Sequence, residues 1–115
     1  MREFVAVGSK EYVMDFLKDF QQKSLKLAEQ YNIKSSIITA NDHFYPSKKN
    51  IIKEKMQKAN NLKYELIIDD QVALASFNFH GFHFSKTFDF DEEESIVTGC
   101  VGFGLDRWLE RVRKL

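Results

Sequence analysis

The segment from Thr98 to Trp108 most constrains what this chain can fold into, because a glycine-spaced strand runs there directly into a helix. Alternation along the strand separates two sets of side chains: Thr98, Cys100 and Gly102 on one face, and Gly99, Val101 and Phe103 on the other. A face made of Thr, Cys and Gly is not built for packing alone. Gly102 and Gly104 leave room for a ligand close to the backbone.

Arg107 lies in the first turn of the helix that follows, close to this face. Its planar, permanently charged guanidinium suits phosphate. The apolar residues of the helix recur at i, i+3, i+4 and i+7, which predicts one buried stripe: Leu105, Trp108, Leu109 and Val112. Taken alone, these residues fit an ordinary strand-to-helix corner with a buried cysteine equally well.

Length and composition limit the classes of protein that the chain can belong to. Its 115 residues fit one domain, residues 1–115, and 43% hydrophobic residues can build a core. Lys+Arg and Asp+Glu both number 17, which argues against nucleic-acid binding driven by excess positive charge. One cysteine excludes an internal disulfide. With neither a membrane-length apolar run nor a signal-peptide pattern, we expect a cytoplasmic location and no membrane partner.

Periodicity predicts a mixture of strands and helices. A helix over Lys10–Tyr31, with Ser9 as its N-cap and Asn32 as its stop, has the strongest pattern. Its predicted stripe is Val13, Phe16, Leu17, Phe20, Leu27, Ala28 and Tyr31. The other predicted elements are strands over Met1–Val7 and Ser35–Thr39, a lysine-rich helix over Lys48–Asn60, a hairpin of Leu62–Ile68 with Val72–Phe79, and a strand or loop over Phe82–Phe90.

The second hairpin strand carries polar residues at period two. Ser76, Asn78 and His80 share one face, and such a row either lines a ligand cavity or forms an exposed sheet face. The lysine-rich helix likewise has two interpretations, a nucleic-acid patch or a solvated face, and the neutral charge of the chain favours the second.

Several segments resemble one family. Cys-Val-Gly-Phe-Gly-Leu-Asp-Arg-Trp resembles motif 3 of the class II aminoacyl-tRNA synthetases, and most closely that of the amino acid:[carrier protein] ligases, which are seryl-tRNA synthetase homologues. The segment Met1–Gly8 resembles the second strand of motif 2. The segments Lys63–Leu66 and Ser76–His80 resemble later strands of the same ligases. The resemblance implies an α+β domain, the later part of a synthetase-like antiparallel sheet flanked by helices.

The resemblance also implies a chemistry: ATP with Mg²⁺ activates a small amino acid as an aminoacyl-adenylate, which is transferred to an acyl carrier protein. Arg107 matches the motif 3 arginine, expected at the γ-phosphate. Gly102 and Gly104 match the glycines beneath the nucleotide, and Ser76 and Asn78 match positions that line the site.

Zinc is a further implied cofactor. The ligases hold it through two cysteines and a glutamate; Cys100 matches the second cysteine and Glu3 the glutamate. The position of the first cysteine lies upstream of residue 1, and His80 or His83 is a conceivable substitute. Phe82 stands where the family usually has a polar residue.

Three functions stay open at this point. The chain is the later part of a carrier-protein ligase, a fragment of a seryl-type tRNA synthetase, or a non-catalytic domain that kept the fold. Because motif 1 and the first motif 2 strand have no counterpart here, a homodimer or a complementing N-terminal chain is an expected partner. Neutral charge makes tRNA the less favoured acceptor.

Overall fold

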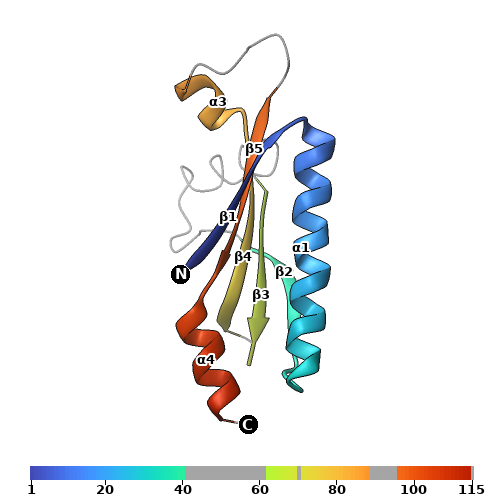
Figure 1. The fold of residues 1–115 in the computed structure, drawn as a ribbon, viewed down its shortest axis with the longest axis vertical. Coiled ribbons are helices and arrows are strands. Elements are labelled where there is room, and N and C mark those ends of the chain that lie inside the picture. Colours follow the sequence, from blue (N-terminus) through green and yellow to red (C-terminus); the bar gives the residue numbers. More distant parts are fainter. Residues whose placement is uncertain (41–61, 70, 89–95, 115) are drawn as a thin grey trace, which may run out of the picture.

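A five-stranded antiparallel sheet is the framework of the protein (Figure 1). The computed structural model describes residues 1–40, 62–69, 71–88 and 96–114. The elements in chain order are β1 (Arg2–Gly8), α1 (Lys10–Gln30), β2 (Ser36–Thr39), β3 (Leu62–Ile68), β4 (Val72–Gly81), α3 (His83–Thr87), β5 (Val97–Phe103) and α4 (Leu105–Arg113). The strand order β1-β5-β4-β3-β2 places β4 and β5 inside the sheet. The predicted α+β class is confirmed.

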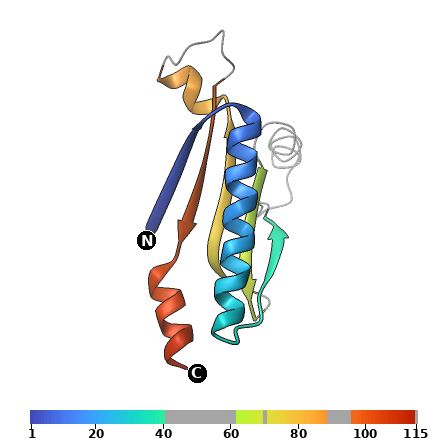
Figure 2. The same ribbon diagram turned by 45° about the vertical axis from the view of Figure 1, so that its right-hand side comes forward.

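Helix α1 covers one face of this sheet (Figure 2). Its buried side chains meet Phe77 and Val101 of the central strands, and all three apolar members are fully or almost fully buried: Val13, Leu17 and Ala28. Aromatic ring pairs link α1 to β1 and β5. The ring centroid of Phe20 lies 4.9 Å from that of Phe4 in β1 and 6.3 Å from that of Phe103 in β5.

Both ends of α1 follow from local sequence. The Ser9 hydroxyl accepts a hydrogen bond of 3.1 Å from the Tyr12 backbone N–H, the N-cap contact that the sequence predicts. At the other end Asn32 has a φ of 55°, and the N–H groups of Asn32 and Ile33 donate to the carbonyls of Glu29 and Ala28. This pair of bonds is a Schellman motif, so the predicted stop is confirmed.

The structure corrects two details of the helix stripes. In α1, Leu27 and Tyr31 are exposed, and Ser24 is buried in their place because its hydroxyl donates to the Phe20 carbonyl at 2.6 Å. In α4, Leu105 and Leu109 are more than half exposed, while Trp108 is buried. A polar residue can replace an apolar one in a helix interface when the helix backbone satisfies its hydroxyl.

The prediction of a strand or loop from Phe82 onward is also wrong. A short helix, α3, occupies His83–Thr87, and the Ser85 hydroxyl donates to the Ile96 carbonyl. Phe84 packs edge-on against His80 and His83, with ring centroids 4.9 and 5.0 Å away. These side-chain contacts favour a helical turn over continued strand alternation. The predicted helix over Lys48–Asn60 lies outside the described residues.

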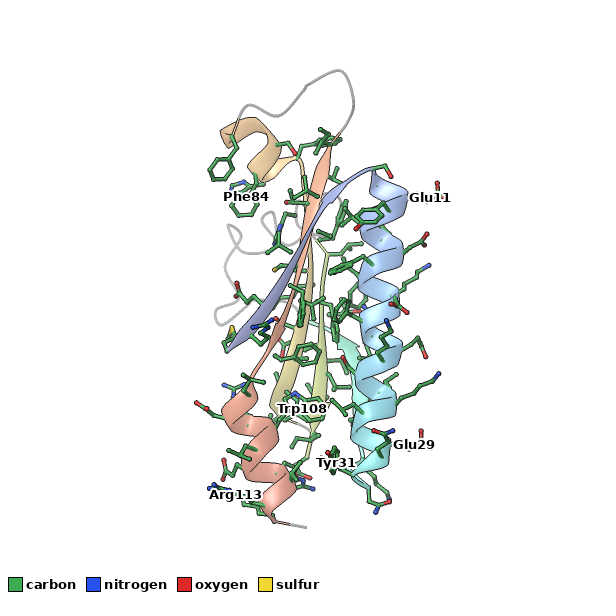
Figure 3. The ribbon with its side chains drawn as sticks, in the orientation of Figure 1. Glu11, Glu29, Tyr31, Phe84, Trp108 and Arg113 are labelled. Carbon is green, nitrogen blue, oxygen red and sulfur yellow. The ribbon has the colours of Figure 1, made fainter. Side chains whose placement is uncertain are left out.

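Helix α4 begins where β5 ends, and two hydrogen bonds fix it to β4. The Gly104 backbone N–H and the Trp108 indole N–H both donate to the Leu74 carbonyl at 2.9 Å. Figure 3 shows Trp108 and Phe84 toward opposite ends of the sheet. In the described part of the chain, no helix is long and apolar enough to cross a bilayer.

Candidate functional site

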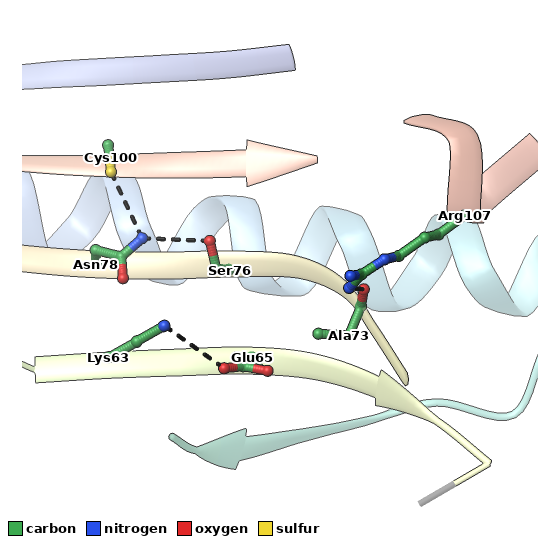
Figure 4. Close-up of polar contacts among 7 residues, drawn as sticks. All are labelled: Lys63, Glu65, Ala73, Ser76, Asn78, Cys100 and Arg107. Atoms are coloured by element: carbon green, nitrogen blue, oxygen red, sulfur yellow. Dashed lines mark hydrogen bonds and ion pairs between the residues drawn. The ribbon is translucent and has the colours of Figure 1, made fainter. Parts of the chain in front are cut away.

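A row of polar side chains lies on the sheet face opposite α1, as the alternation of β4 and β5 predicts. Ser76 is paired with Gly102 and Asn78 with Cys100 across the two strands, so all four positions share this face. Figure 4 shows Ser76, Asn78 and Cys100 with α1 behind the sheet. The two central strands therefore carry the core on one face and polar groups on the other.

Asn78 connects this row through its side-chain amide. Its Nδ2 donates to the Ser76 hydroxyl at 3.3 Å and to the Cys100 Sγ at 3.5 Å (Figure 4). Two acceptors on neighbouring strands fix the orientation of the amide, which leaves the Asn78 Oδ1 directed away from them. A fixed amide suits recognition of a polar ligand.

His80 joins the row at a bulge in β4. The pairing register with β5 shifts between Phe79 and Gly81, and Gly81 has a φ of 58°. His80 is the extra residue of this bulge. Its Nδ1 lies 2.9 Å from the Thr98 hydroxyl and its Nε2 3.4 Å from the Cys100 Sγ. Strand alternation predicts that His80 lies on the polar face, as it does. The bulge is what brings both ring nitrogens close to side chains of β5.

Burial changes the acid–base properties of His80 and Cys100. Partial burial, aided by the nearby charge of His83, lowers the pKa of His80 below its ordinary value of 6.5. Burial raises the pKa of the Cys100 thiol above 9.0; the Asn78 hydrogen bond opposes this rise, Glu3 adds to it, and Lys63 opposes it. At neutral pH the pair therefore consists of a neutral imidazole and a thiol.

Glycine stands at positions 99 and 102 of β5 for different physical reasons. A Cβ at Gly99 would lie 2.7 Å from the Val13 Cγ1, so packing of α1 requires glycine there. A Cβ at Gly102 would meet only ordinary contacts, the nearest being the Ser76 Oγ at 3.4 Å. Packing does not require glycine at Gly102. Gly102 is buried, with the Met1 Sδ and the Glu3 Cγ 3.6 and 4.0 Å from that Cβ position, so a nucleotide would have to displace these β1 side chains to reach its backbone.

Arg107 lies at the end of the row. Its Nη1 donates to the Ala73 carbonyl near the start of β4 at 2.7 Å (Figure 4), and the side chain passes over Gly104, where a Cβ would lie 3.4 Å from the Arg107 Cδ. The exposed guanidinium is thus anchored to the strand that carries Ser76 and Asn78. That Arg107 and this row bind one nucleotide stays a prediction.

Two residues of β3 extend the row and were not assigned a role from the sequence. Lys63 is paired with Asn78, and Glu65 with Ser76, across the β3–β4 register. Lys63 Nζ lies 3.7 Å from Glu65 Oε1, and their side chains are 33% and 24% exposed. Strand alternation in the Lys-Tyr-Glu-Leu segment places Lys63 and Glu65 on one face, and the predicted hairpin gives their partner strand, but the register of the pairing could not be read from the sequence.

The donor set for zinc is incomplete within the described residues. Glu3 shares the polar face and lies opposite Gly102 on β1, whereas Cys100 lies opposite Val5. No three His, Cys, Asp or Glu side chains in residues 1–40, 62–69, 71–88 and 96–114 come together as a metal site. The residues present do not fit a three-ligand zinc centre.

The chain is similar in sequence to ligases that act on carrier proteins or on tRNA. The chain is 32% identical over 114 residues to amino acid–[acyl-carrier-protein] ligase 1 of Bradyrhizobium diazoefficiens and 33% identical to ligase 2 of the same organism. It is 31% identical to a type-2 serine–tRNA ligase of Methanococcus maripaludis. Each match covers 93% of this chain. No family model matches the chain.

A solved structure supports the fold. The chain aligns with M. kandleri SerRS in complex with A. aeolicus tRNASec at a TM-score of 0.70 and 19% identity, over 96% of this chain and 23% of that one. The chain spans about a third of the length of the two ligases, 35% and 34%. Both sequence and fold thus match a defined part of larger enzymes.

Proposed function

We propose that this chain, a class II aminoacyl-tRNA synthetase-like domain, forms part of the site of a ligase that activates a small amino acid with ATP and transfers it to a carrier protein. The observation that carries the proposal is the polar face of β4 and β5, with bare backbone at Gly102 and the Arg107 guanidinium at its end. The two carrier-protein ligases match 93% of the chain, which supports the same assignment.

Two residues of the face, Gly102 and Arg107, would contact a nucleotide. Arg107 would bind phosphate oxygens, because its hydrogen bond to the Ala73 carbonyl uses only part of the guanidinium fork and holds the remainder in place. Gly102 would let the nucleotide approach the sheet backbone. When bound, ATP and Mg²⁺ supply the leaving group and the charge neutralisation for amino-acid activation.

Ser76 and Asn78 would orient the substrate beside the nucleotide. The Asn78 amide is fixed by the Ser76 hydroxyl and the Cys100 sulfur, so an acceptor and a hydroxyl point from one rigid strand. Preorganised groups of this kind accelerate a reaction mainly by positioning. Zinc is left out of this proposal, because the described residues lack a third ligand.

A seryl-type tRNA synthetase is the second candidate function, and the identity to type-2 serine–tRNA ligases favours it. The balance of 17 basic and 17 acidic residues favours the carrier protein, because tRNA binding draws on positive charge. The acceptors are distinguished by offering the activated amino acid either carrier protein or tRNA, in the context of a complete enzyme.

Nucleotide binding by the chain tests the proposal directly. Titration calorimetry with Mg·ATP is expected to show binding that Arg107→Ala weakens by about tenfold or more, the loss of one charge-assisted contact. Arg113→Ala is the matched control, since Arg113 is an exposed arginine of the same helix. Equal affinities of the two variants would remove Arg107 from the site.

A further inference from the structure

We propose that Asp69, in the turn between β3 and β4, is a positioning residue for Arg107. Its carboxylate holds helix α4 through Arg111, one turn after Arg107, and so sets where the Arg107 guanidinium lies at the end of the polar row. The inference rests on the proposed function in so far as Arg107 binds phosphate. Whether Asp69 holds the helix can be measured without a nucleotide.

Helix α4 has little apolar packing to fix its orientation. Trp108 is the one buried residue among Leu105–Arg113, and Leu105 and Leu109 are more than half exposed. The Trp108 indole N–H and the Gly104 backbone N–H donate to the same carbonyl, that of Leu74, at 2.9 Å. Two donors that meet at one carbonyl form a pivot. A second point of contact with the sheet is needed to fix how the helix is turned about this pivot.

The contact between Arg111 and Asp69 is this second point. Arg111 Nη1 lies 2.8 Å from Asp69 Oδ2, and Nη2 of the same guanidinium lies 3.5 Å from Oδ1. A two-point contact between guanidinium and carboxylate fixes direction as well as distance. Arg107 and Arg111 are four residues apart, so they share one face of the helix and both reach the β3–β4 hairpin. Holding Arg111 in place therefore restrains Arg107.

The backbone of the turn presents the Asp69 carboxylate for this contact. Asp69 has a φ of 48°, in the left-handed region that aspartate and asparagine tolerate better than most residues. The Gln71 N–H closes the turn by donating to the Ile68 carbonyl at 3.2 Å. Because asparagine tolerates the same backbone, Asp69→Asn should keep the turn and remove only the negative charge and one acceptor oxygen.

The orientation of α4 decides where the Arg107 guanidinium lies. Its Nη1 donates to the Ala73 carbonyl at 2.7 Å (Figure 4), and the other nitrogens of the fork would bind phosphate. Rotation of the helix about Trp108 would move these nitrogens relative to the polar row. Activation by ATP depends on the placement of charged donors, so a group that prevents this rotation supports the site without touching the ligand.

The Asp69–Arg111 pair is partly exposed, with side chains that are 61% and 31% accessible. Exposed ion pairs contribute little to the stability of a whole domain. A small energy is enough, however, to select one orientation of a loosely packed helix. We therefore expect Asp69→Asn to change the docking of α4 and the binding of phosphate, with little effect on global unfolding.

Acrylamide quenching of fluorescence tests the helix contact without nucleotide. Trp108 is the only tryptophan of the chain and is 8% exposed, so quenching reports how firmly α4 is docked. Asp69→Asn should raise the quenching constant about twofold, within the range of an exposed ion pair. Arg111→Gln should give the same rise, and the double variant should add nothing to it. High salt should raise quenching in the parent, because it screens the pair, and not in Asp69→Asn.

Glu110→Gln is the matched control. It removes another exposed ion pair of α4, Glu110–Lys114 at 3.2 Å, which joins two residues of the helix and its end and makes no link to the hairpin. Its quenching constant should equal that of the parent. Equal quenching in the parent and in a folded Asp69→Asn chain would overturn the inference.

Titration calorimetry with Mg·ATP tests whether the contact acts through Arg107. Asp69→Asn should weaken binding by about two- to fivefold, while Glu110→Gln should bind as the parent does. In an Arg107→Ala chain, Asp69→Asn should change the affinity no further, because the group that it positions is gone. An equal loss with and without Arg107 would overturn the inference. Parent-like affinity of Arg107→Ala would instead contradict the proposed function, and the quenching measurements would still decide whether Asp69 holds α4.

Discussion

Gly99 and Gly102 show how one strand divides its residues between packing and function. Gly99 faces α1, where a Cβ would clash with Val13 and would lie 3.0 Å from the Asn78 carbonyl. Gly102 faces the polar row, where a Cβ would clash with nothing. The two glycines are alike in the sequence, and only their opposite faces separate the structural role from the proposed binding role.

Substitution by alanine should separate these roles. Gly99→Ala is expected to lower the free energy of unfolding by about 1–3 kcal/mol, because overpacking forces the stiff Val13 or the backbone to move. Gly102→Ala should leave stability within about 0.5 kcal/mol and should weaken Mg·ATP binding. Urea denaturation and calorimetry of both variants measure the two quantities. Equal destabilisation by both substitutions would contradict the contrast.

The lowered pKa of His80 predicts a pH dependence of stability. Between the lowered pKa and 6.5 the unfolded chain binds a proton at His80 that the folded chain does not. The stabilisation is therefore fully present above 6.5 and is lost as the pH falls through this window. Urea denaturation at about pH 7 and about pH 5 should show a smaller loss of stability in His80→Gln than in the parent. An equal loss in both would show that His80 does not titrate differently on folding.

From the sequence, the part of the site that could be predicted is the face of the sheet on which each residue lies. Alternation placed Ser76, Asn78 and Cys100 on one face, and the structure agrees. The contact of His80 with Cys100 depends on the bulge before Gly81, a feature of strand pairing that no local pattern indicates. The pairing register of β3 with β4 likewise decides that Lys63 lies beside Asn78. The face of each residue and the hairpin pairing were predictable, whereas the bulge and the exact register between strands were not.

At the scale of elements, α1 was the most predictable part because its ends are set locally. Ser9 caps its start, and Asn32 ends it in the left-handed conformation that Asn tolerates. The strands that matched their predicted bounds are likewise bordered by local turn signals, such as Asp69 with its φ of 48°. Helix α3 was missed because tertiary ring contacts, not periodicity, determine it.

Removal of the Ser9 cap should weaken α1 measurably. Ser9→Ala deletes the acceptor for the Tyr12 N–H and is expected to cost about 1 kcal/mol of unfolding free energy. Ser9→Asp should retain most of the stability, since a carboxylate accepts the same bond near the positive end of the helix dipole. Urea denaturation measures the difference in unfolding free energy between each variant and the parent, provided that its dependence on urea concentration is unchanged. A Ser9→Ala chain as stable as the parent would contradict the capping role.

At the scale of the whole molecule, the sheet ends in a strand with exposed apolar residues. β1 pairs with β5 on one side, and its outward face carries Val5 and Val7, 65% and 48% exposed. An exposed edge of this kind favours pairing with another strand. We therefore predict that β1 pairs with a strand of a second copy or of another chain.

The isolated chain should therefore exchange pyrophosphate into ATP poorly. Clamping of the α-phosphate needs donors beyond Arg107, and loss of one such contact typically costs about a hundredfold or more in rate. Amino-acid-dependent ATP–pyrophosphate exchange by the purified chain is expected near background. Robust exchange by the chain alone would show that its own face suffices.

A hybrid enzyme tests whether this face takes part in amino-acid activation. The chain replaces the matching part of amino acid–[acyl-carrier-protein] ligase 1, and ATP–pyrophosphate exchange is measured with small amino acids. Exchange is expected to depend on the amino acid, to be lost in Arg107→Ala and to persist in the Arg113→Ala control. A folded hybrid without exchange for any amino acid, or one in which Arg107→Ala retains full exchange, would contradict it.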